Sequence, residues 1–319
     1  KRFKSSSWLS RRRKESSSAR RGCARPSRWE RLDNFRLTDS TPPLAKRRKY
    51  AAVEAKSPRE ANTSSVITSP AIPGEVPAPT QPFPTKPAAF DYQGVTIDDL
   101  VDFTPEIRAL ALEAVEGFRL GPLFTPLDRP IEGVTRGTIM RPPDGGTAGW
   151  AGAAVDPETG ILYVPSAYSQ NVAALVPSEH PRADVRLVRE KYTPLQGPQG
   201  LPMFKPPYGR LTAIDLNQGD IAWQVPNGEG PRDHPAIQDL DLPWLGQPGR
   251  ASVLITSSLV FLGEGGNTGV SALPQWYGGP GGKMFRAYDK ATGEVVWEME
   301  LPGGTSGAPM TYMVDGRQY

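Results

Sequence analysis

Few side chains in this sequence have the types and spacing that local catalytic motifs require. His180 and His234 lie in different segments without a second ligand at metal-binding spacing, so we expect surface or structural roles for both. The single cysteine, Cys23, excludes a disulfide framework and a cysteine-based zinc site. The sequence contains no phosphate-binding loop, dinucleotide fingerprint or nucleophile elbow. Chemistry through any of these motifs is therefore excluded.

Three carboxylates cluster just before a predicted helix: Asp98, Asp99 and Asp102. Acidic side chains are favourable near the positive end of a helix, so we interpret them as solvated capping charges. A calcium site is the alternative reading of the same cluster.

The helix itself is predicted over residues 105–118. Thr104 is a suitable N-cap, Pro105 suits the first helical position, and Gly121 with Pro122 would stop the helix. Helical spacing gives it one apolar face, which consists of Ile107, Leu110, Ala111, Ala114 and Phe118. We expect this helix to serve packing.

An internal repeat is the clearest pattern in the chain. Residues 213–223 align without gaps on residues 287–297 in the frame A-x-D-x-x-x-G-[DE]-x-x-W. Each copy predicts a hairpin, because the Asp can accept hydrogen bonds from turn amides and the Gly permits a positive φ. The return strand delivers the Trp to a sheet face. We therefore interpret the following as turn and docking residues, and not as catalytic ones: Asp215, Asp289, Trp223 and Trp297.

Each copy follows a second predicted hairpin, which turns at 156–160 in the first copy and at 257–258 in the second. The result is two four-stranded units, roughly 150–226 and 251–302, with a third that opens at Ala308 and turns at Asp315-Gly316. Such units predict an all-β fold, a partial β-propeller of two full blades and the start of a third. Two or three blades cannot close a ring, so we expect the chain to be a fragment.

Composition divides the chain into three parts. Residues 1–65 form a basic tail, since the first sixty residues carry 19 Lys and Arg against 6 Asp and Glu, and without apolar periodicity we expect disorder. A nucleic-acid-binding tail is the alternative, but the remainder is acidic, so we expect no nucleic-acid partner. Residues 66–148 are a Pro-rich extended connection that contains the helix, and 149–319 form the partial propeller. The most apolar stretch, 251–263, is too short to span a bilayer.

An ordered set of segments resembles a known family. The matching segments are EVPAPTQPFPTKPAAF at 75–90, DFTPEIR at 102–108, GPLFTP at 121–126, DPETGILYVPS at 156–166, PRDHP at 231–235, FRAYDKATGEVVWEMELP at 285–302 and PMTYMVDGRQY at 309–319. Together with the tryptophan docking repeat, they resemble pyrroloquinoline-quinone (PQQ)-dependent dehydrogenases of the quinoprotein glucose dehydrogenase type, whose propellers have eight blades. The docking repeat alone would also fit non-catalytic propellers.

This resemblance implies a cofactor and a reaction. PQQ and Ca²⁺ would be the cofactors, and a sugar or polyol would be the substrate. Electrons would pass to a membrane quinone or a cytochrome, and the protein would be periplasmic or periplasm-facing. In this family the catalytic aspartate, most calcium ligands and the stacking Trp come from earlier blades, so we predict no catalytic residue and no metal ligand in this chain.

The same resemblance implies two cofactor-binding segments. Gly149 stands where the family usually has an Asn that contacts the cofactor, and Trp150 follows it. A glycine cannot supply the amide, so that contact is lost or comes from the backbone. Leu245 and Gly246 lie in a PWLG segment that resembles a loop reaching the cofactor from the next blade. A structural Trp at strand entry and an ordinary inter-blade turn are the corresponding alternatives.

Two functions remain open from the sequence. The first is a fragment of a PQQ- and calcium-dependent dehydrogenase, expected to be inactive by itself because half of the site is missing. The second is a non-catalytic propeller of the same type that serves as a scaffold or binding module. The segments outside the docking repeat favour the first.

Overall fold

The structure is a computed structural model, and it describes residues 62–65, 76, 80–84, 86–143, 145–149, 151–167, 170–190, 195–266 and 282–319. The chain divides into two units, and all described residues belong to the second, Lys56–Tyr319. The predicted disorder of the basic tail concerns residues that, apart from 62–65, lie outside the described ones.

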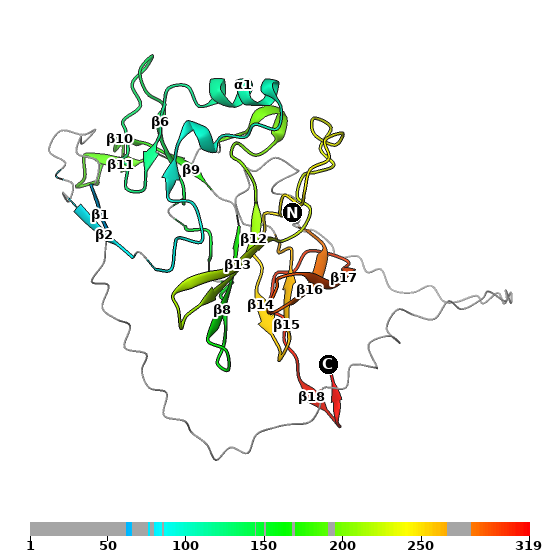
Figure 1. Cartoon of the computed structure of the whole chain (residues 1–319). Coiled ribbons are helices and arrows are strands. Elements are labelled where there is room, and N and C mark those ends of the chain that lie inside the picture. Colours follow the sequence, from blue (N-terminus) through cyan, green and yellow to red (C-terminus); the bar gives the residue numbers. More distant parts are fainter. Residues whose placement is uncertain are drawn as a thin grey trace, which may run out of the picture. The chain divides into compact units, whose positions relative to one another are not determined.

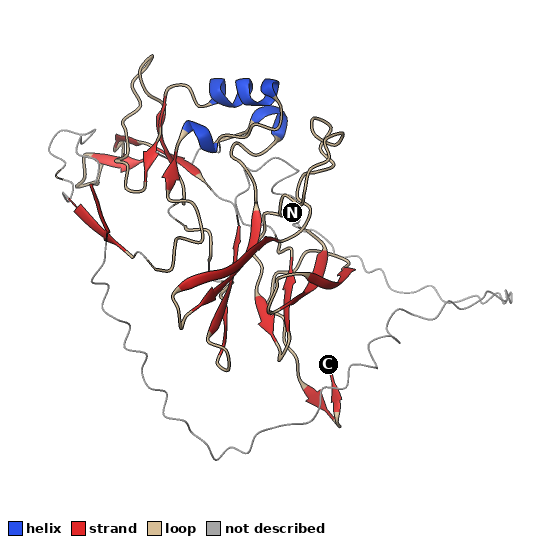
Figure 2. Cartoon of the chain, viewed as in Figure 1, coloured by secondary structure: helices blue, strands red, loops and turns tan. Residues whose placement is uncertain are grey.

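Strands dominate the described chain, and a single α-helix accompanies them there (Figures 1 and 2). The first four-stranded sheet, blade 1, has the order β13-β12-β8-β7, with β7 at Ala154–Asp156, β8 at Ile161–Ala167, β12 at Gly209–Asp215 and β13 at Asp220–Pro226. The second, blade 2, has the order β14-β15-β16-β17, with β14 at Val253–Ile255, β15 at Leu259–Gly263, β16 at Met284–Asp289 and β17 at Val295–Glu300. All neighbours within both sheets are antiparallel. The two predicted blades are confirmed.

The third predicted unit begins as a separate hairpin. Strands β18 (Met313–Val314) and β19 (Arg317–Gln318) pair across Asp315 and Gly316, which have φ of 49° and 77°. Two consecutive positive φ values are what a tight two-residue hairpin turn needs, and Asp-Gly supplies them at low steric cost.

The connection before blade 1 is more structured than the predicted extended chain. It contains β2 (Thr80–Phe83), β3 (Gly94–Val95) paired with β5 (Gly121–Pro122), the 3₁₀ turn η2 (Ile97–Asp99), helix α1 (Pro105–Ala114), β4 (Phe118–Arg119) and β6 (Gly137–Met140). Strand β2 pairs with β1 (Asn62–Ser65), so the last four residues of the predicted disordered tail form a strand. Helix α1 begins as predicted, since the Thr104 hydroxyl accepts a hydrogen bond from the Ile107 amide at 3.2 Å. It ends at Ala114, four residues earlier than predicted.

The early helix end changes its packing. Gly117 adopts φ +78°, and Phe118 enters strand β4 instead of a further helical turn. Ile107 and Ala111 are buried as predicted, whereas Leu110 is 40% exposed. Ala114 and Phe118 are partly buried against the same core, so Leu110 is the one predicted position of the five that faces solvent.

Blade 1 contains an insertion between β8 and β12 that the sequence reading missed. It holds β9 (Asn171–Ala173), β10 (Leu175–Pro177), β11 (Leu187–Arg189) and the turn η3 (Pro198–Gly200). Strand β9 pairs with β6, which pairs in turn with β4, so the insertion and the connection share one sheet. The Val101 amide also donates to the Met203 carbonyl at 2.9 Å. These two segments consequently form one layer, although they are far apart in the sequence: Thr138 pairs with Ala173, and Val101 bonds to Met203.

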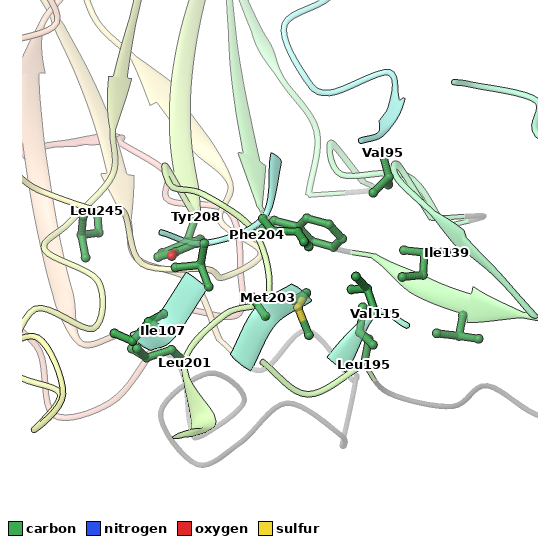
Figure 3. Packing of buried hydrophobic residues seen from close by; sticks show 14 of the residues in the cluster. Val95, Ile107, Val115, Ile139, Leu195, Leu201, Met203, Phe204, Tyr208 and Leu245 are labelled. Carbon is green, nitrogen blue, oxygen red and sulfur yellow. The ribbon is translucent and has the colours of Figure 1, made fainter. Parts of the chain in front are cut away.

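The larger apolar core lies in this shared layer. Figure 3 shows buried side chains from the helix, from the insertion and from the loop after blade 1 meeting there, including Ile107, Phe204, Tyr208 and Leu245. Each of these four is at most 2% exposed. The core therefore attaches the loop that contains Leu245 to the connection layer.

The smaller apolar core lies between the two blades. Tyr163, Leu211 and Ala213 of blade 1 pack with Val260, Leu262 and Tyr288 of blade 2. The Trp223 indole lies so close to Gly293 that a Cβ on this glycine would stand 2.8 Å from ring carbon Cε3. Its Nε1 donates to the Lys290 carbonyl at 3.1 Å. The first predicted docking tryptophan thus joins adjacent blades.

Lys290 makes several of the hydrogen bonds at the same junction. Its carbonyl also accepts from the Tyr163 hydroxyl at 3.2 Å, and its Nζ donates to the Asp156 carboxylate at 2.5 Å and to the Thr256 carbonyl at 3.0 Å. The Lys290 and Asp156 side chains are only 11% and 6% exposed. Burial alone would raise the pKa of Asp156, but hydrogen bonds from Lys290, Thr159 and the Glu158 amide outweigh it and lower this pKa to about 2.

The turn aspartates of the repeat behave as predicted. Asp215 accepts hydrogen bonds from the Asn217 and Gln218 amides, and Asp289 accepts from the Ala291 and Thr292 amides. These amides lower the pKa of both carboxyl groups, which stay ionised. No helix in the described ranges is long and apolar enough to cross a membrane.

Replacing Trp223 by Phe removes the hydrogen bond to Lys290 and part of the ring that lies against Gly293. We expect the variant Trp223→Phe to lose about 1–2 kcal/mol of unfolding free energy. Trp297→Phe is the matched control, because Trp297 holds the same repeat position but makes no indole hydrogen bond within the described residues. Urea unfolding of both variants checks the difference, and equal losses would contradict this account of the junction.

The Asp156–Lys290 pair predicts an acid-sensitive blade junction. The folded pKa of about 2 lies below the ordinary 3.8, so Asp156 contributes stability above pH 3.8 that is lost as pH falls toward 2. We expect roughly 2 kcal/mol from this source at pH 7. Asp156→Asn should lower stability at pH 7 and flatten its dependence between pH 4 and pH 2. Asp220→Asn, which removes an exposed ion pair with Lys86, should leave that dependence unchanged.

Candidate functional site

The two ends of the blades differ in their connections. One end carries the short turns at 157–160, 216–219, 256–258 and 290–294. The other carries longer segments, whose described parts are 145–149, 151–153, 170–190, 195–208, 227–252, 264–266 and 282–283. Binding residues collect on long loops held by a rigid scaffold. Three of the four predicted cofactor-binding residues, Gly149, Leu245 and Gly246, belong to this loop end.

Residues 227–229 and 245–247 form a two-armed backbone ribbon at the loop end. The amides of Leu245, Gly246 and Gln247 donate to the carbonyls of Glu229, Gly228 and Asn227 at 2.9, 2.9 and 2.7 Å. The ribbon is also joined to blade 1, because the Tyr208 amide donates to the Leu245 carbonyl at 2.7 Å. Its backbone is therefore held on both sides.

Glycines make this close approach possible. Gly246 has φ +79°, and a Cβ on it would stand 2.2 Å from the Gly209 carbonyl oxygen. A Cβ on Gly209 would stand 2.0 Å from the Gln247 carbonyl oxygen. The predicted site residue Gly246 is consequently a position at which only glycine fits.

Leu245 points into the protein. Its side chain is 2% exposed and belongs to the larger core with Tyr208 and Ile107 (Figure 3). The ribbon amides are occupied by its own hydrogen bonds, so a ligand at this position would meet packed backbone and the neighbouring indole of Trp244. The prediction that Leu245 and Gly246 contact a cofactor stays a prediction.

The other predicted segment is more open. Thr147 is attached to the end of β8, where the Ala167 amide donates to its carbonyl at 3.0 Å. Gly149 has no atom within 4 Å of the place a Cβ would take, and neither do Gly145 and Gly146. Trp150 lies outside the described residues. The segment thus offers exposed backbone, and its predicted cofactor contact also stays a prediction.

A buried ion pair lies against the ribbon. Arg286 Nη1 donates to Glu264 Oε1 at 2.7 Å, and Arg286 Nε donates to Glu298 Oε2 at 3.1 Å. The Arg286 guanidinium lies 5.0 Å from the ring centroid of Trp244. Burial by itself would lower the pKa of Arg286, but its hydrogen bond and charge interaction with Glu264 raise it. The guanidinium therefore stays charged beneath the indole.

A neutral polar chain continues from this pair. The Tyr288 hydroxyl donates to Asn227 Oδ1 at 2.7 Å, and Asn227 Nδ2 donates to the Gly263 carbonyl at 2.9 Å. Burial strongly raises the pKa of Tyr288, so its hydroxyl stays protonated and donates. This chain links blade 2 to the ribbon.

A second buried ion pair joins the connection to blade 1. Arg210 of β12 pairs with Asp91, and their side chains are 4% and 7% exposed. The guanidinium of Arg141 lies 3.4 Å from the ring centroid of Tyr92, and that of Arg210 lies 5.3 Å from it. Residues 86–92 therefore contact the side of blade 1 that faces away from blade 2.

The histidines have the structural roles that were predicted, but the acidic cluster does not cap helix α1: Asp99 caps the turn η2, and Asp102 forms an ion pair. His234 is 5% exposed, its Nε2 lies 3.1 Å from the Gln199 carbonyl, and its Nδ1 accepts from the Ala236 amide. His180 Nδ1 accepts from the Arg182 amide in an exposed loop. Asp99 accepts from the Thr96 amide and hydroxyl, and Asp102 pairs with Lys205 at 2.7 Å.

Calcium and a quinone cofactor fit these residues to different degrees. Among the described residues, no three His, Cys, Asp or Glu side chains come together as metal ligands, so these residues do not fit a calcium site. An aromatic cofactor would find the Trp244 indole and the open glycine backbone at 145–149. Both are groups that an aromatic ligand can contact.

Comparison with known proteins identifies the family. Residues 62–319 match the family described as PQQ: Glucose/ethanol/alcohol dehydrogenase, beta-propeller domain. The chain belongs to this PQQ dehydrogenase family. The relationship predicted from the sequence segments is thereby confirmed, and the partial propeller with it.

The curated PQQ-family relatives are much longer than this chain. The glycerol dehydrogenase large subunit of Gluconobacter oxydans (strain 621H) is 27% identical in an alignment over 283 residues that covers 78% of this chain and 34% of that protein. The quinoprotein glucose dehydrogenase of Escherichia coli (strain K12) is 26% identical over 279 residues, 77% of this chain and 31% of that protein. The quinate/shikimate dehydrogenase (quinone) of Acinetobacter baylyi is 33% identical over 131 residues, 38% of this chain and 14% of that protein. The chain spans about a third of the length of the first two.

Sequence reasoning missed Glu264 and Arg286 of this PQQ-family chain. One signal was present, because Glu264 directly follows the apolar strand 259–263 and stands between two glycines. Arg286 is the first of three consecutive buried residues in β16, 286–288, and is 2% exposed. A charge at a buried strand position indicates a buried partner, but the sequence alone does not show which carboxylate it meets.

A Cβ at position 246 would collide with blade 1 and require an unfavourable positive φ. We expect Gly246→Ala to cost roughly 3 kcal/mol of unfolding free energy. Gly145→Ala is the matched control, since Gly145 has open space and no positive φ. Thermal melting of both variants checks this, and an unchanged melting temperature for Gly246→Ala would show that the ribbon is not packed as described.

Proposed function

We propose that this chain is part of a PQQ- and calcium-dependent dehydrogenase that oxidises a hydroxyl group of a sugar or polyol. The family match over residues 62–319 carries the proposal, because it extends over both blades and the connection layer and not only over the docking repeat. The named relatives include dehydrogenases of glycerol and glucose. A glucose-type substrate is the finer proposal.

The loop end of the two blades is the proposed cofactor wall. Gly149, Trp150, Leu245 and Gly246 would border the quinone, with the Trp244 indole beside them. When bound, PQQ would supply the two-electron oxidant, and any calcium ion would be held by other parts of the parent protein, because the described residues contain no cluster of metal ligands. The described residues of this chain contribute shape and exclusion of water: the core around Leu245 and the closely packed Gly209–Gly246 contact leave no room for solvent beneath the wall.

The catalytic base and the calcium ligands are proposed to lie in other parts of the parent protein. The electron acceptor would be a membrane quinone or a cytochrome; one relative is named as a quinone-linked enzyme. The proposed location is the periplasm or a periplasm-facing membrane surface.

The decisive experiment uses the full-length protein of which this chain is proposed to be a part. Expressed in the presence of PQQ and Ca²⁺, it should reduce an artificial dye when glucose, glycerol or another polyol is added, and should lose that activity on chelation of Ca²⁺. A folded full-length protein that binds no PQQ and reduces no dye would instead support a scaffold propeller.

This chain alone should be inactive. Purified residues 1–319 with PQQ and Ca²⁺ should show no sugar-dependent dye reduction, because the described residues hold no metal-ligand cluster and the proposed base lies elsewhere. Spectrophotometry with a redox dye measures this, with a relative such as a quinoprotein glucose dehydrogenase as the positive control. Sugar-dependent reduction above the no-sugar background would contradict the proposed division of the site.

A further inference from the structure

The Glu264–Arg286 pair is buried at the position where the ribbon meets blade 2. The two side chains are 9% and 2% exposed. Besides the 2.7 Å contact with Arg286, Glu264 accepts from the Met284 amide through Oε2 at 3.2 Å. The pair thus connects β15 and β16 at their loop ends, directly beside the Trp244 indole.

The backbone around the carboxylate has no room for side chains. A Cβ on Gly228 would stand 2.4 Å from Glu264 Oε1, and a Cβ on Gly282 would stand 2.0 Å from Glu264 Oε2. Gly228 is itself a ribbon residue, and its carbonyl accepts from the Gly246 amide. The carboxylate therefore touches the ribbon arm opposite Gly246, while the guanidinium touches Trp244 next to it.

A net gain in folding stability does not by itself explain why an ion pair is buried here. Removing two charges from water costs about as much as their attraction returns, and well-packed apolar residues of similar size often serve equally well. What an ion pair adds over apolar packing is direction, because the hydrogen bonds and the planar guanidinium define one geometry. The geometry defined here is that of the segment Trp244–Gly246.

We propose that Glu264 and Arg286 are positioning residues, which hold Trp244 and the Leu245–Gly246 backbone in a single conformation at the loop end. The pair touches the ribbon and not the cofactor, so it acts through the ribbon. Only the identity of the ligand that the ribbon faces rests on the proposed function.

Amide hydrogen exchange on the full chain tests the proposal. In the double variant Glu264→Met/Arg286→Met, the ribbon amides of Leu245, Gly246 and Gln247 should exchange at least tenfold faster. The amides of the β8–β12 ladder in blade 1 should keep their rates, since the variant replaces charges by apolar groups of similar volume. Lys283→Met/Glu300→Met is the matched control, because it removes an exposed ion pair from the same sheet, between the residue before β16 and the last residue of β17. This control should leave ribbon exchange unchanged.

A second variant covers the case in which the double variant does not fold. Arg286→Lys keeps a positive charge beside Glu264 but loses the planar group beneath Trp244. We expect ribbon exchange to rise severalfold and the near-ultraviolet circular dichroism to change. That spectral change should be absent when the same substitution is made in a Trp244→Phe background, which assigns it to this indole.

Two results would overturn the proposal. Unchanged ribbon exchange in the folded variants would show that the core and the glycine contacts alone hold the ribbon. An equal rise in ribbon and ladder exchange would show a general stabilising role. Binding of PQQ to the full-length parent protein, measured by tryptophan fluorescence, separates this proposal from the function. Faster ribbon exchange in the variants, together with no PQQ binding by the parent protein, would keep the positioning role and remove the cofactor contact.

Discussion

The packing of the Trp223 indole on Gly293 is the contact on which the described structure depends. Each four-stranded sheet has two faces and can bury them only against another layer. Trp223 brings one face of blade 1 against blade 2, where the absent side chain of Gly293 leaves space for the ring and the Lys290 carbonyl accepts the indole N–H. Once this contact is made, the loop ends of the two blades lie next to each other, and the ribbon after blade 1 can reach both.

Buried ion pairs define the geometry at three places around this junction. Asp156 and Lys290 join the blades near the short turns, Glu264 and Arg286 join blade 2 to the ribbon, and Asp91 and Arg210 join the connection to blade 1. Apolar contacts alone allow sheets to slide, because they are not directional. Charged hydrogen bonds specify one arrangement, which is the property that a cofactor wall needs.

The chemistry available at the loop end is limited, because the backbone amides of the ribbon already donate hydrogen bonds within the protein. The ribbon amides are hydrogen-bonded within the ribbon, and Leu245 is part of the core. Under the proposed function, this part of the protein would offer a quinone a shaped surface and an aromatic ring, while reactive groups and the metal would come from elsewhere in the parent protein. This division agrees with a chain that spans about a third of the length of its relatives.

The sequence by itself determined the blades, because their hairpins are local. A turn aspartate bonds to amides two and three residues away, and a positive φ belongs to a single glycine, so both repeats and the Asp315-Gly316 turn could be predicted from neighbouring residues. The helix start was local too, but its end and the exposure of Leu110 depended on a sheet formed with strand β9, far along the chain. Only the tertiary structure decided that Gly246 meets Gly209, that Leu245 turns into the core and that Arg286 meets Glu264 beneath Trp244. These contacts join segments that are distant in sequence. Their energies depend on burial and on hydrogen-bond geometry, and residue types and spacing reveal neither.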